Sequence, residues 1–147
     1  MNRASAIYAL TDVHLTPQPL DPDSIIEGTP LARSATLTRS ADQTAFTMVW
    51  DCSAGVFRWY YSFDETLHVL EGSAMIDDGS SPPRAIGPGD VVFFPAGATA
   101  VWRVDSYIRK VAFCRKTLPA PIGAVLRTLR SAKKVLKAAQ PAVMGAS

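Results

Sequence analysis

Short β-strand-like runs, each bounded by turn-forming residues, fill the middle of this chain and constrain its fold more than any other feature. Between about residues 34 and 115, runs rich in β-branched and aromatic residues alternate with Gly, Pro, Asp and Ser. The runs are AFTMVW, GVFRWYY, TLHVLEG, AMID, DVVFFP, TAVWRV and YIRKVAFC. Because no helical pattern comes between them, they predict an all-β sandwich or barrel. With 147 residues, 48% of them hydrophobic, the chain can bury one such core.

The two ends of the chain have different patterns from the middle. The first 32 residues contain four prolines among polar turn formers. Since proline lacks the N–H that a central strand needs, they predict an arm or edge segment. Beyond residue 117, apolar residues recur at three- and four-residue spacing, which predicts one amphipathic helix ended by Pro141. We therefore expect an N-terminal arm (1–33), a β-barrel (34–117), a C-terminal helix (118–140) and a tail (141–147).

The net charge of +2 conceals an uneven distribution along the chain. Residues 1–110 hold all 13 acidic residues and 8 of the 15 Lys and Arg, whereas residues 111–147 hold the other 7 and no acid. The basic excess therefore belongs to the C-terminal region. Packing of the helix on the barrel, with its basic side chains in solvent, is the favoured interpretation; an anionic membrane surface or nucleic acid is the alternative. Because the helix lacks Trp and Phe, we expect neither partner.

Cysteine usage and hydropathy indicate the compartment. Cys52 and Cys114 are too few for a disulfide framework and lack metal-type spacing, so we expect both to be buried strand residues. No apolar run approaches the ~18 residues that a membrane helix needs, and the apolar stretch near the N-terminus is too short for a signal peptide. These features predict a protein of a reducing compartment, the cytoplasm.

Two glycine-containing motifs give the middle of the chain a family resemblance. Six residues separate Glu65 from Gly72, as in the first cupin motif, and Gly89, Pro95 and Gly97 match the second. The chain therefore resembles the cupins, and among them most the small ureidoglycine aminohydrolase-type and ethanolamine-utilisation-like members. The resemblance implies a single RmlC-like jelly-roll β-barrel made of two antiparallel sheets. It also implies a homodimer.

The motifs also show which residues occupy the positions where cupins hold a metal. The two histidine positions of the first motif fall on Trp59 and Tyr61, and the histidine position of the second falls on Ala100. A tryptophan N–H can only donate a hydrogen bond, and alanine has no side-chain atom that could bind a metal. The carboxylate of Glu65 and the phenol of Tyr61 are therefore the only possible metal ligands at these motif positions. We therefore expect no tightly bound metal and no cofactor.

The remaining carboxylate of that set is Glu65. By the resemblance it points into the mouth of the barrel, and a desolvated carboxylate needs a partner. The resemblance implies Lys110, because the aminohydrolase has a substrate-contacting lysine there. The predicted pocket residues are Trp59, Tyr61, Glu65, Ala100, Trp102 and Lys110.

Two functions are compatible with this pocket, besides a structural interpretation in which aromatic side chains simply fill the barrel around an ion pair. In the first, the barrel binds a small polar or anionic metabolite through Lys110 and Tyr61, with Trp59 and Trp102 as walls. In the second, an aminohydrolase- or isomerase-like enzyme acts on a small nitrogenous or carbonyl metabolite. There Glu65 is the general base or acid and Lys110 sets its charge. Binding is the favoured hypothesis and catalysis the alternative.

Overall fold

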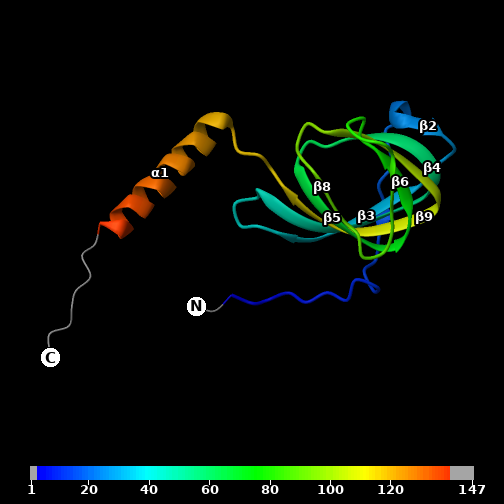
Figure 1. Cartoon of the computed structure of the whole chain (residues 1–147). Coiled ribbons are helices and arrows are strands. Elements are labelled where there is room, and N and C mark those ends of the chain that lie inside the picture. Colours follow the sequence, from blue (N-terminus) through cyan, green and yellow to red (C-terminus); the bar gives the residue numbers. More distant parts are fainter. Residues whose placement is uncertain (1–2, 140–147) are drawn as a thin grey trace. The chain divides into compact units, whose positions relative to one another are not determined.

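The computed structural model describes residues 3–139, which form two compact units, one ending at Thr117 and the other beginning at Leu118. The first unit is a β-barrel with an N-terminal arm, and the second contains a single helix (Figure 1). The strands are β1 (Thr16–Pro17), β2 (Ile25–Glu27), β3 (Ala32–Arg39), β4 (Ala45–Tyr60), β5 (Asp64–Gly72), β6 (Ala74–Asp77), β7 (Arg84–Ile86), β8 (Val91–Phe94) and β9 (Thr99–Arg115). A 3-10 turn (Pro22–Ser24) precedes β2, and helix α1 spans Ala120–Ala138. The predicted all-β fold with an N-terminal arm and a C-terminal helix is confirmed.

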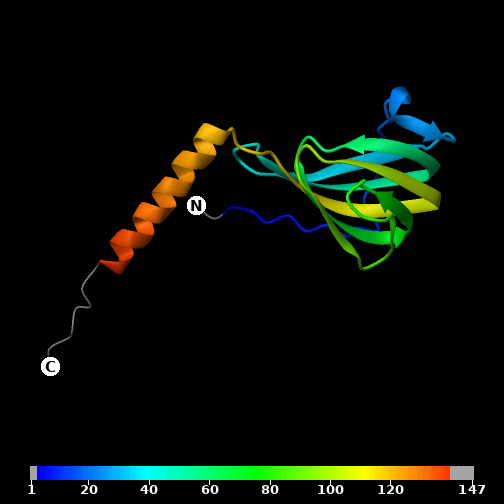
Figure 2. The same ribbon diagram turned by 45° about the horizontal axis from the view of Figure 1, so that its top comes forward.

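All strand pairings are antiparallel, and the strands form one continuous nine-stranded sheet with the path β1-β3-β4-β9-β5-β8. Off this path, β2 pairs with β4, and β6 pairs with β7 and β9. The two separate sheets implied by the resemblance are therefore two halves of one sheet. Strands β4 and β9 run side by side through both halves (Figure 2). Their long ladder, from Ala45 to Tyr60 on β4, connects the two halves.

Two pairs of predicted short strands are each a single long strand in the structure. β4 joins AFTMVW to GVFRWYY, and β9 joins TAVWRV to YIRKVAFC. The polar residues between the runs form a bulge, with a shift of register between Ser53 and Gly55, and not a turn. Such a bulge reverses the alternation of side chains, so that Trp50 before it and Phe57 after it both point into the core. β3 was not among the predicted runs because its sequence, ARSATLTR, is largely polar.

Glycines with positive φ form the turns on either side of β8. Gly89 has φ +91° and Gly97 has φ +90°, a region that residues with a Cβ rarely adopt. In the first turn, the backbone N–H of Gly87 donates to Asp90 Oδ2 at 2.8 Å. The segments GPGD and PAG therefore form tight turns at these two glycines.

The N-terminal arm lies against the barrel and is held by hydrogen bonds from it. Leu15 and Leu20 in the arm are buried. The backbone N–H of Gln18 donates to the carbonyl of Ala32, and Arg109 donates to the carbonyl of Leu10 at 2.8 Å. Two short strands, β1 and β2, belong to the arm, and they pair with β3 and β4 respectively. The predicted bounds of the arm, 1–33, stay a prediction.

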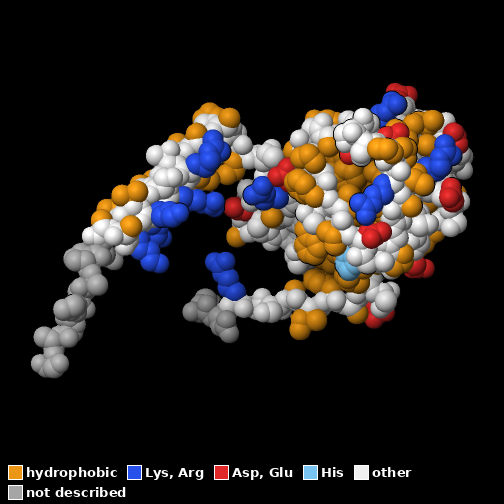
Figure 3. Space-filling view, in the orientation of Figure 1, with side chains coloured by type: hydrophobic (Ala, Val, Ile, Leu, Met, Phe, Trp, Pro, Cys, Tyr) orange, Lys and Arg blue, Asp and Glu red, His pale blue; other side chains and the backbone are white. Residues whose placement is uncertain are grey.

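Helix α1 belongs to the second unit. None of its residues is buried, and its Lys and Arg side chains gather along one side (Figure 3). Its predicted packing on the barrel stays a prediction, and the predicted end at Pro141 and the tail lie outside the described residues. No helix within residues 3–139 is long and apolar enough to span a membrane.

Candidate functional site

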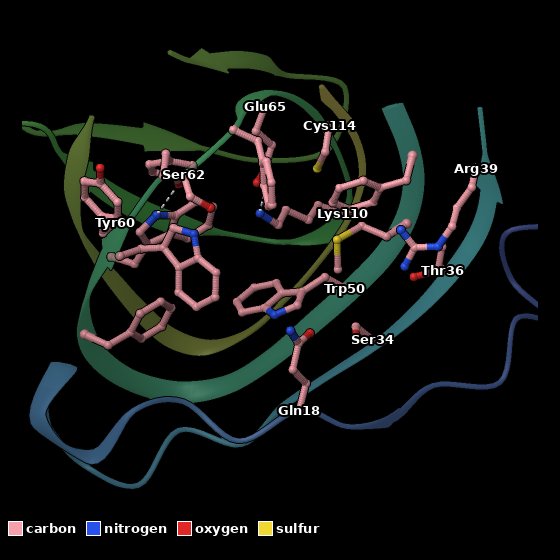
Figure 4. A pocket seen from close by; sticks show the side chains of 17 residues that line it. Gln18, Ser34, Thr36, Arg39, Trp50, Tyr60, Ser62, Glu65, Lys110 and Cys114 are labelled. Atoms are coloured by element: carbon pink, nitrogen blue, oxygen red, sulfur yellow. Dashed lines mark hydrogen bonds and ion pairs between the residues drawn. The ribbon is translucent and has the colours of Figure 1, made fainter. Parts of the chain in front are cut away.

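A cavity of about 280 Å³ opens into the barrel between β3, β4, β5 and β9 (Figure 4). Five of the six predicted pocket residues line it: Trp59, Tyr61, Glu65, Trp102 and Lys110. The sixth, Ala100, does not line the cavity and is buried in the core, with 1% of its surface exposed. Its place in the pocket is therefore a correction to the prediction. Ala100 lies opposite Trp59 in the register of β4 and β9, and Trp59 is the member of this pair that lines the cavity.

The register of three strands explains how these distant residues meet. β9 lies between β4 and β5 and pairs with both. Lys110 on β9 lies opposite Trp50 on β4, and Cys114 on β9 lies opposite Glu65 on β5. Because Lys110 and Cys114 are four residues apart on one strand, they share a face. The barrel interior therefore receives a cation, a carboxylate, a thiol and an indole on one face of the sheet.

The central contact of the cavity wall is an ion pair. Lys110 Nζ donates a hydrogen bond to Glu65 Oε1 at 2.5 Å, and the two side chains are only 8% and 10% exposed. The predicted partnership of these residues is confirmed. Nζ also lies 4.9 Å from the ring centroid of Trp50 and 5.0 Å from that of Trp102. Since the faces of aromatic rings are electronegative, both indoles stabilise the ammonium.

Lys110 keeps part of its hydrogen-bonding capacity. An ammonium group has three N–H donors, and among residues 3–139 Glu65 provides the one hydrogen-bond acceptor for Nζ. The other donors face ring surfaces and the cavity. A ligand oxygen entering the cavity would therefore find a charged donor that is already positioned.

The hydroxyl group of Tyr61 is neutral in this site. Trp102 Nε1 donates to Tyr61 Oη at 3.0 Å, and the ring of Tyr61 stacks on Phe94 with centroids 4.2 Å apart. Burial, and secondly the negative charge of Glu65, raise the pKa of the Tyr61 phenol far above its usual value. The group therefore stays protonated and can donate to a ligand.

Both cysteines are free and buried, as predicted. Burial, and secondly the Glu65 carboxylate, raise the pKa of the Cys114 thiol to about 12. Burial, and secondly Asp51, raise the pKa of Cys52 to about 11. Because the thiolate is the reactive form, these thiols lack the ionisation of a catalytic cysteine.

A metal ion of the kind that cupins hold does not fit these residues. At the positions that correspond to its ligands, Trp59 offers only an N–H donor and Ala100 offers no polar side-chain atom. Tyr61 Oη already accepts a hydrogen bond, and Glu65 is paired with Lys110. Within residues 3–139, no group of three or more His, Cys, Asp or Glu is arranged to hold a metal ion.

Sequence reasoning missed several residues of the cavity wall. Trp50 lines it, and the alternation of Trp50 and Cys52 with polar Asp51 and Ser53 was a signal for its inward direction. The polar edge of the cavity was missed because β3 was not recognised as a strand. This edge consists of Gln18, Ser34, Thr36 and Arg39.

A second buried polar cluster, also missed, lies outside the cavity. Asp51 is 1% exposed and accepts hydrogen bonds from Arg33 Nε at 3.0 Å and from Tyr107 Oη at 2.8 Å. Arg109, which also holds the carbonyl of Leu10 in the arm, lies 4.0 Å from the same carboxylate. The cluster thus connects the arm to the outer face of β4 and β9.

The comparisons with known proteins agree with this fold. Residues 39–112, half of the chain, match the sequence profile described as the EutQ-like cupin domain. Similar solved structures include a protein of unknown function from Pseudomonas syringae pv. tomato, with 27% identity and a TM-score of 0.64 over 70% of this chain. The match spans less than half, 45%, of that protein. None of the curated proteins matches this chain.

Two further structures are named for ethanolamine utilisation. The EutQ protein of Clostridium difficile has 15% identity and a TM-score of 0.57, over 73% of this chain and 83% of that one. A putative ethanolamine utilization protein Q from Salmonella typhimurium has 18% identity and a TM-score of 0.54, over 71% of this chain and 96% of that one. At such identities they show the shared fold. The predicted likeness to small cupins is confirmed, whereas its aminohydrolase part stays a prediction.

Proposed function

The chain belongs to the family of EutQ-like cupin domains, and we propose that its barrel binds a small polar or anionic metabolite. The observation that carries this proposal is the buried Glu65–Lys110 pair, which lies in the wall of an open cavity between indole rings. Aromatic walls with few convergent polar groups are typical of small-molecule sites. The volume of about 280 Å³ lies just below the range of roughly 300–1,000 Å³ usual for drug-sized ligands, which favours a small metabolite.

The energetics of buried charge support binding over a purely structural pair. Replacing a buried ion pair by apolar residues of similar volume is often neutral or stabilising, so such a pair is weak evidence of a structural role. Here Glu65 and Lys110 lie beside a cavity that apolar side chains could have filled. A role toward a ligand accounts for their presence better than stability does.

The charge of Lys110 restricts the ligand. The site between Trp50 and Trp102, where an aromatic pocket would hold an external cation, already holds the protein's own ammonium. A cationic ligand would therefore find the place between these two indoles occupied. A neutral or anionic ligand with an oxygen acceptor can instead bond to Lys110 while its body packs on Trp59.

Thermal stabilisation by a panel of metabolites tests the proposal. A ligand that binds only the folded state at 100 times its Kd adds about 2.7 kcal/mol to the free energy of unfolding. We expect carboxylates or neutral oxygen-bearing compounds to raise Tm, and cationic amines to leave it unchanged.

The matched control is a double variant, Glu65→Leu with Lys110→Met, which replaces both charges by apolar side chains of similar size. It should fold and lose the response to the panel. A Tm response as large as that of the wild type would contradict the proposal. Conversion of a compound that depends on Glu65 would instead favour the enzymatic alternative, with Glu65 and Lys110 as its catalytic residues.

A further inference from the structure

Arg39, the last residue of β3, differs from the other charged residues of the cavity wall. It lines the cavity at the edge formed by Ser34 and Thr36 (Figure 4). Lys110 and Glu65 neutralise one another, whereas Arg39 makes no ion pair with any residue within 3–139. The ionisable wall residues thus leave one net positive charge, and it lies on Arg39.

A β-bulge places Arg39, an exposed residue, on the side of β3 that borders the cavity. Thr36 pairs with Met48, and Thr38 pairs with the adjacent residue of β4, Thr47, so Leu37 is an extra residue in β3. After this bulge, Arg39 lies opposite Phe46, which packs against the barrel core. Without the extra residue, the alternation of side chains would turn Arg39 to the outer face.

Two contacts hold the bulge and the arginine in place. Tyr8 Oη in the N-terminal arm donates to the carbonyl of the extra residue, Leu37, at 2.9 Å. The guanidinium carbon of Arg39 lies 5.3 Å from the ring centroid of Phe46, in a cation–π contact. The cation is thereby held over an aromatic wall while its N–H groups keep no carboxylate partner among the described residues.

From this geometry we propose that the ligand is a small aromatic monoanion whose carboxylate, or an equivalent oxyanion, binds Arg39. The planar guanidinium presents paired N–H donors that match two carboxylate oxygens. The aromatic body packs against Trp50 and Trp59, and a further ligand oxygen accepts from Lys110. This inference rests on the proposed function and names the ligand class for the same cavity. In this inference the anionic group of the ligand contacts Arg39, whereas the sequence-based hypothesis assigned that contact to Lys110.

The three tryptophans of the chain provide a direct readout. All three, Trp50, Trp59 and Trp102, line the cavity, so a ligand that enters it changes their emission. Benzoate and benzamide are the probes, because they share a ring and a planar substituent and differ in charge. We expect saturable emission changes with benzoate binding at least about fivefold more tightly than benzamide.

Arg39→Gln should bring the affinity for benzoate down toward that for benzamide and should weaken the binding of benzamide, which carries no charge, far less. Arg58→Gln is the matched control, since Arg58 is an exposed arginine on β4 that does not line the cavity. It should leave both affinities unchanged.

Each other outcome has a distinct meaning. Equal binding of the two probes to the wild type, unaltered by Arg39→Gln, would overturn the anion site and leave the proposed function standing. Emission that responds to neither probe would overturn the aromatic ligand class, and the metabolite panel would then decide the proposed function on its own. If Arg58→Gln lowered the affinity for benzoate as much as Arg39→Gln does, the effect of Arg39 would come from the general surface charge and the proposed anion site would be wrong.

Discussion

Glu65 and Lys110 are two of the three charged residues that are buried among the described residues, the third being Asp51 outside the cavity. Removing one member of a buried pair leaves the other charge without its partner, which is costly. Glu65→Ala should therefore lower the free energy of unfolding by about 1–3 kcal/mol. Glu65→Gln keeps the shape and an acceptor oxygen and should lower it less.

Urea denaturation of the two variants measures the difference. Glu71→Ala is the matched control, because Glu71 is an exposed carboxylate on the same strand. It should have a negligible effect. If none of the three substitutions changed the free energy of unfolding, Glu65 would be a solvated residue at the rim of the cavity and the prediction would be wrong.

Cys114 gives a pH-dependent prediction. The folded-state pKa of its thiol, about 12, lies above the ordinary value of 9.0 because of burial and secondly the charge of Glu65. The unfolded chain therefore loses this proton first as pH rises. The stability linked to the protonated thiol is complete below about pH 9 and decreases from there toward pH 12.

Alkylation tests the same thiol directly. Iodoacetamide at pH 8.5 should leave both cysteines unmodified in the native protein and label both in urea, as read by intact mass. Rapid addition of two labels to the native protein would show that Cys114 is ionised or exposed.

At the scale of the elements, the turn between β5 and β6 depends on the absence of a side chain. Gly72 has φ +73°, and a Cβ there would lie 2.0 Å from the carbonyl oxygen of Tyr107. Gly79 has nearly the same φ, +74°, but open space around it. Gly79→Ala should cost about 1–2 kcal/mol for the backbone alone. Gly72→Ala should cost about 1–3 kcal/mol more, since backbone atoms must move.

Chemical denaturation of these two alanine variants separates the steric contribution from the conformational one. A smaller loss for Gly72→Ala than for Gly79→Ala would mean that the close approach of β5 and β9 at Tyr107 is not maintained in solution.

The elements also show where sequence reasoning succeeds and where it ends. Alternating apolar residues and glycine turns predicted the barrel, and motif spacing brought Glu65 together with Lys110 through the family resemblance. The bulges could not be predicted from the sequence, because the segment DCSAG is typical of a turn unless its pairing with β9 is known. The position of Arg39 depends on one extra residue in β3, and only the register against β4 reveals it.

At the scale of the whole molecule, we predict that no transition metal is linked to folding. The residues at the cupin ligand positions, Trp59, Tyr61 and Ala100, offer no ligand set. Elemental analysis should find well under one equivalent of any transition metal, and a chelator should leave Tm unchanged. A stoichiometric metal that is lost on Glu65→Gln would contradict this account.

A homodimer is the remaining prediction at this scale. β8 ends the main sheet path, and its outward side chains are apolar, with Val91 65% and Phe93 59% exposed. An edge with such residues needs cover. Sedimentation equilibrium at micromolar concentration should show a dimer that Phe93→Asp shifts toward monomer. The control Leu31→Asp, at an exposed leucine elsewhere, should not shift it. A monomeric wild type would contradict the pairing.

The most direct test of the central claim, that the barrel cavity holds a ligand, is its electron density in crystals of protein purified without added ligand. The account predicts ordered density larger than water between β3 and β9, with an acceptor atom within about 3 Å of Lys110 Nζ. A cavity that contains only water, or is closed by Trp59 and its neighbours, would contradict the claim and leave the Glu65–Lys110 pair as part of a filled core.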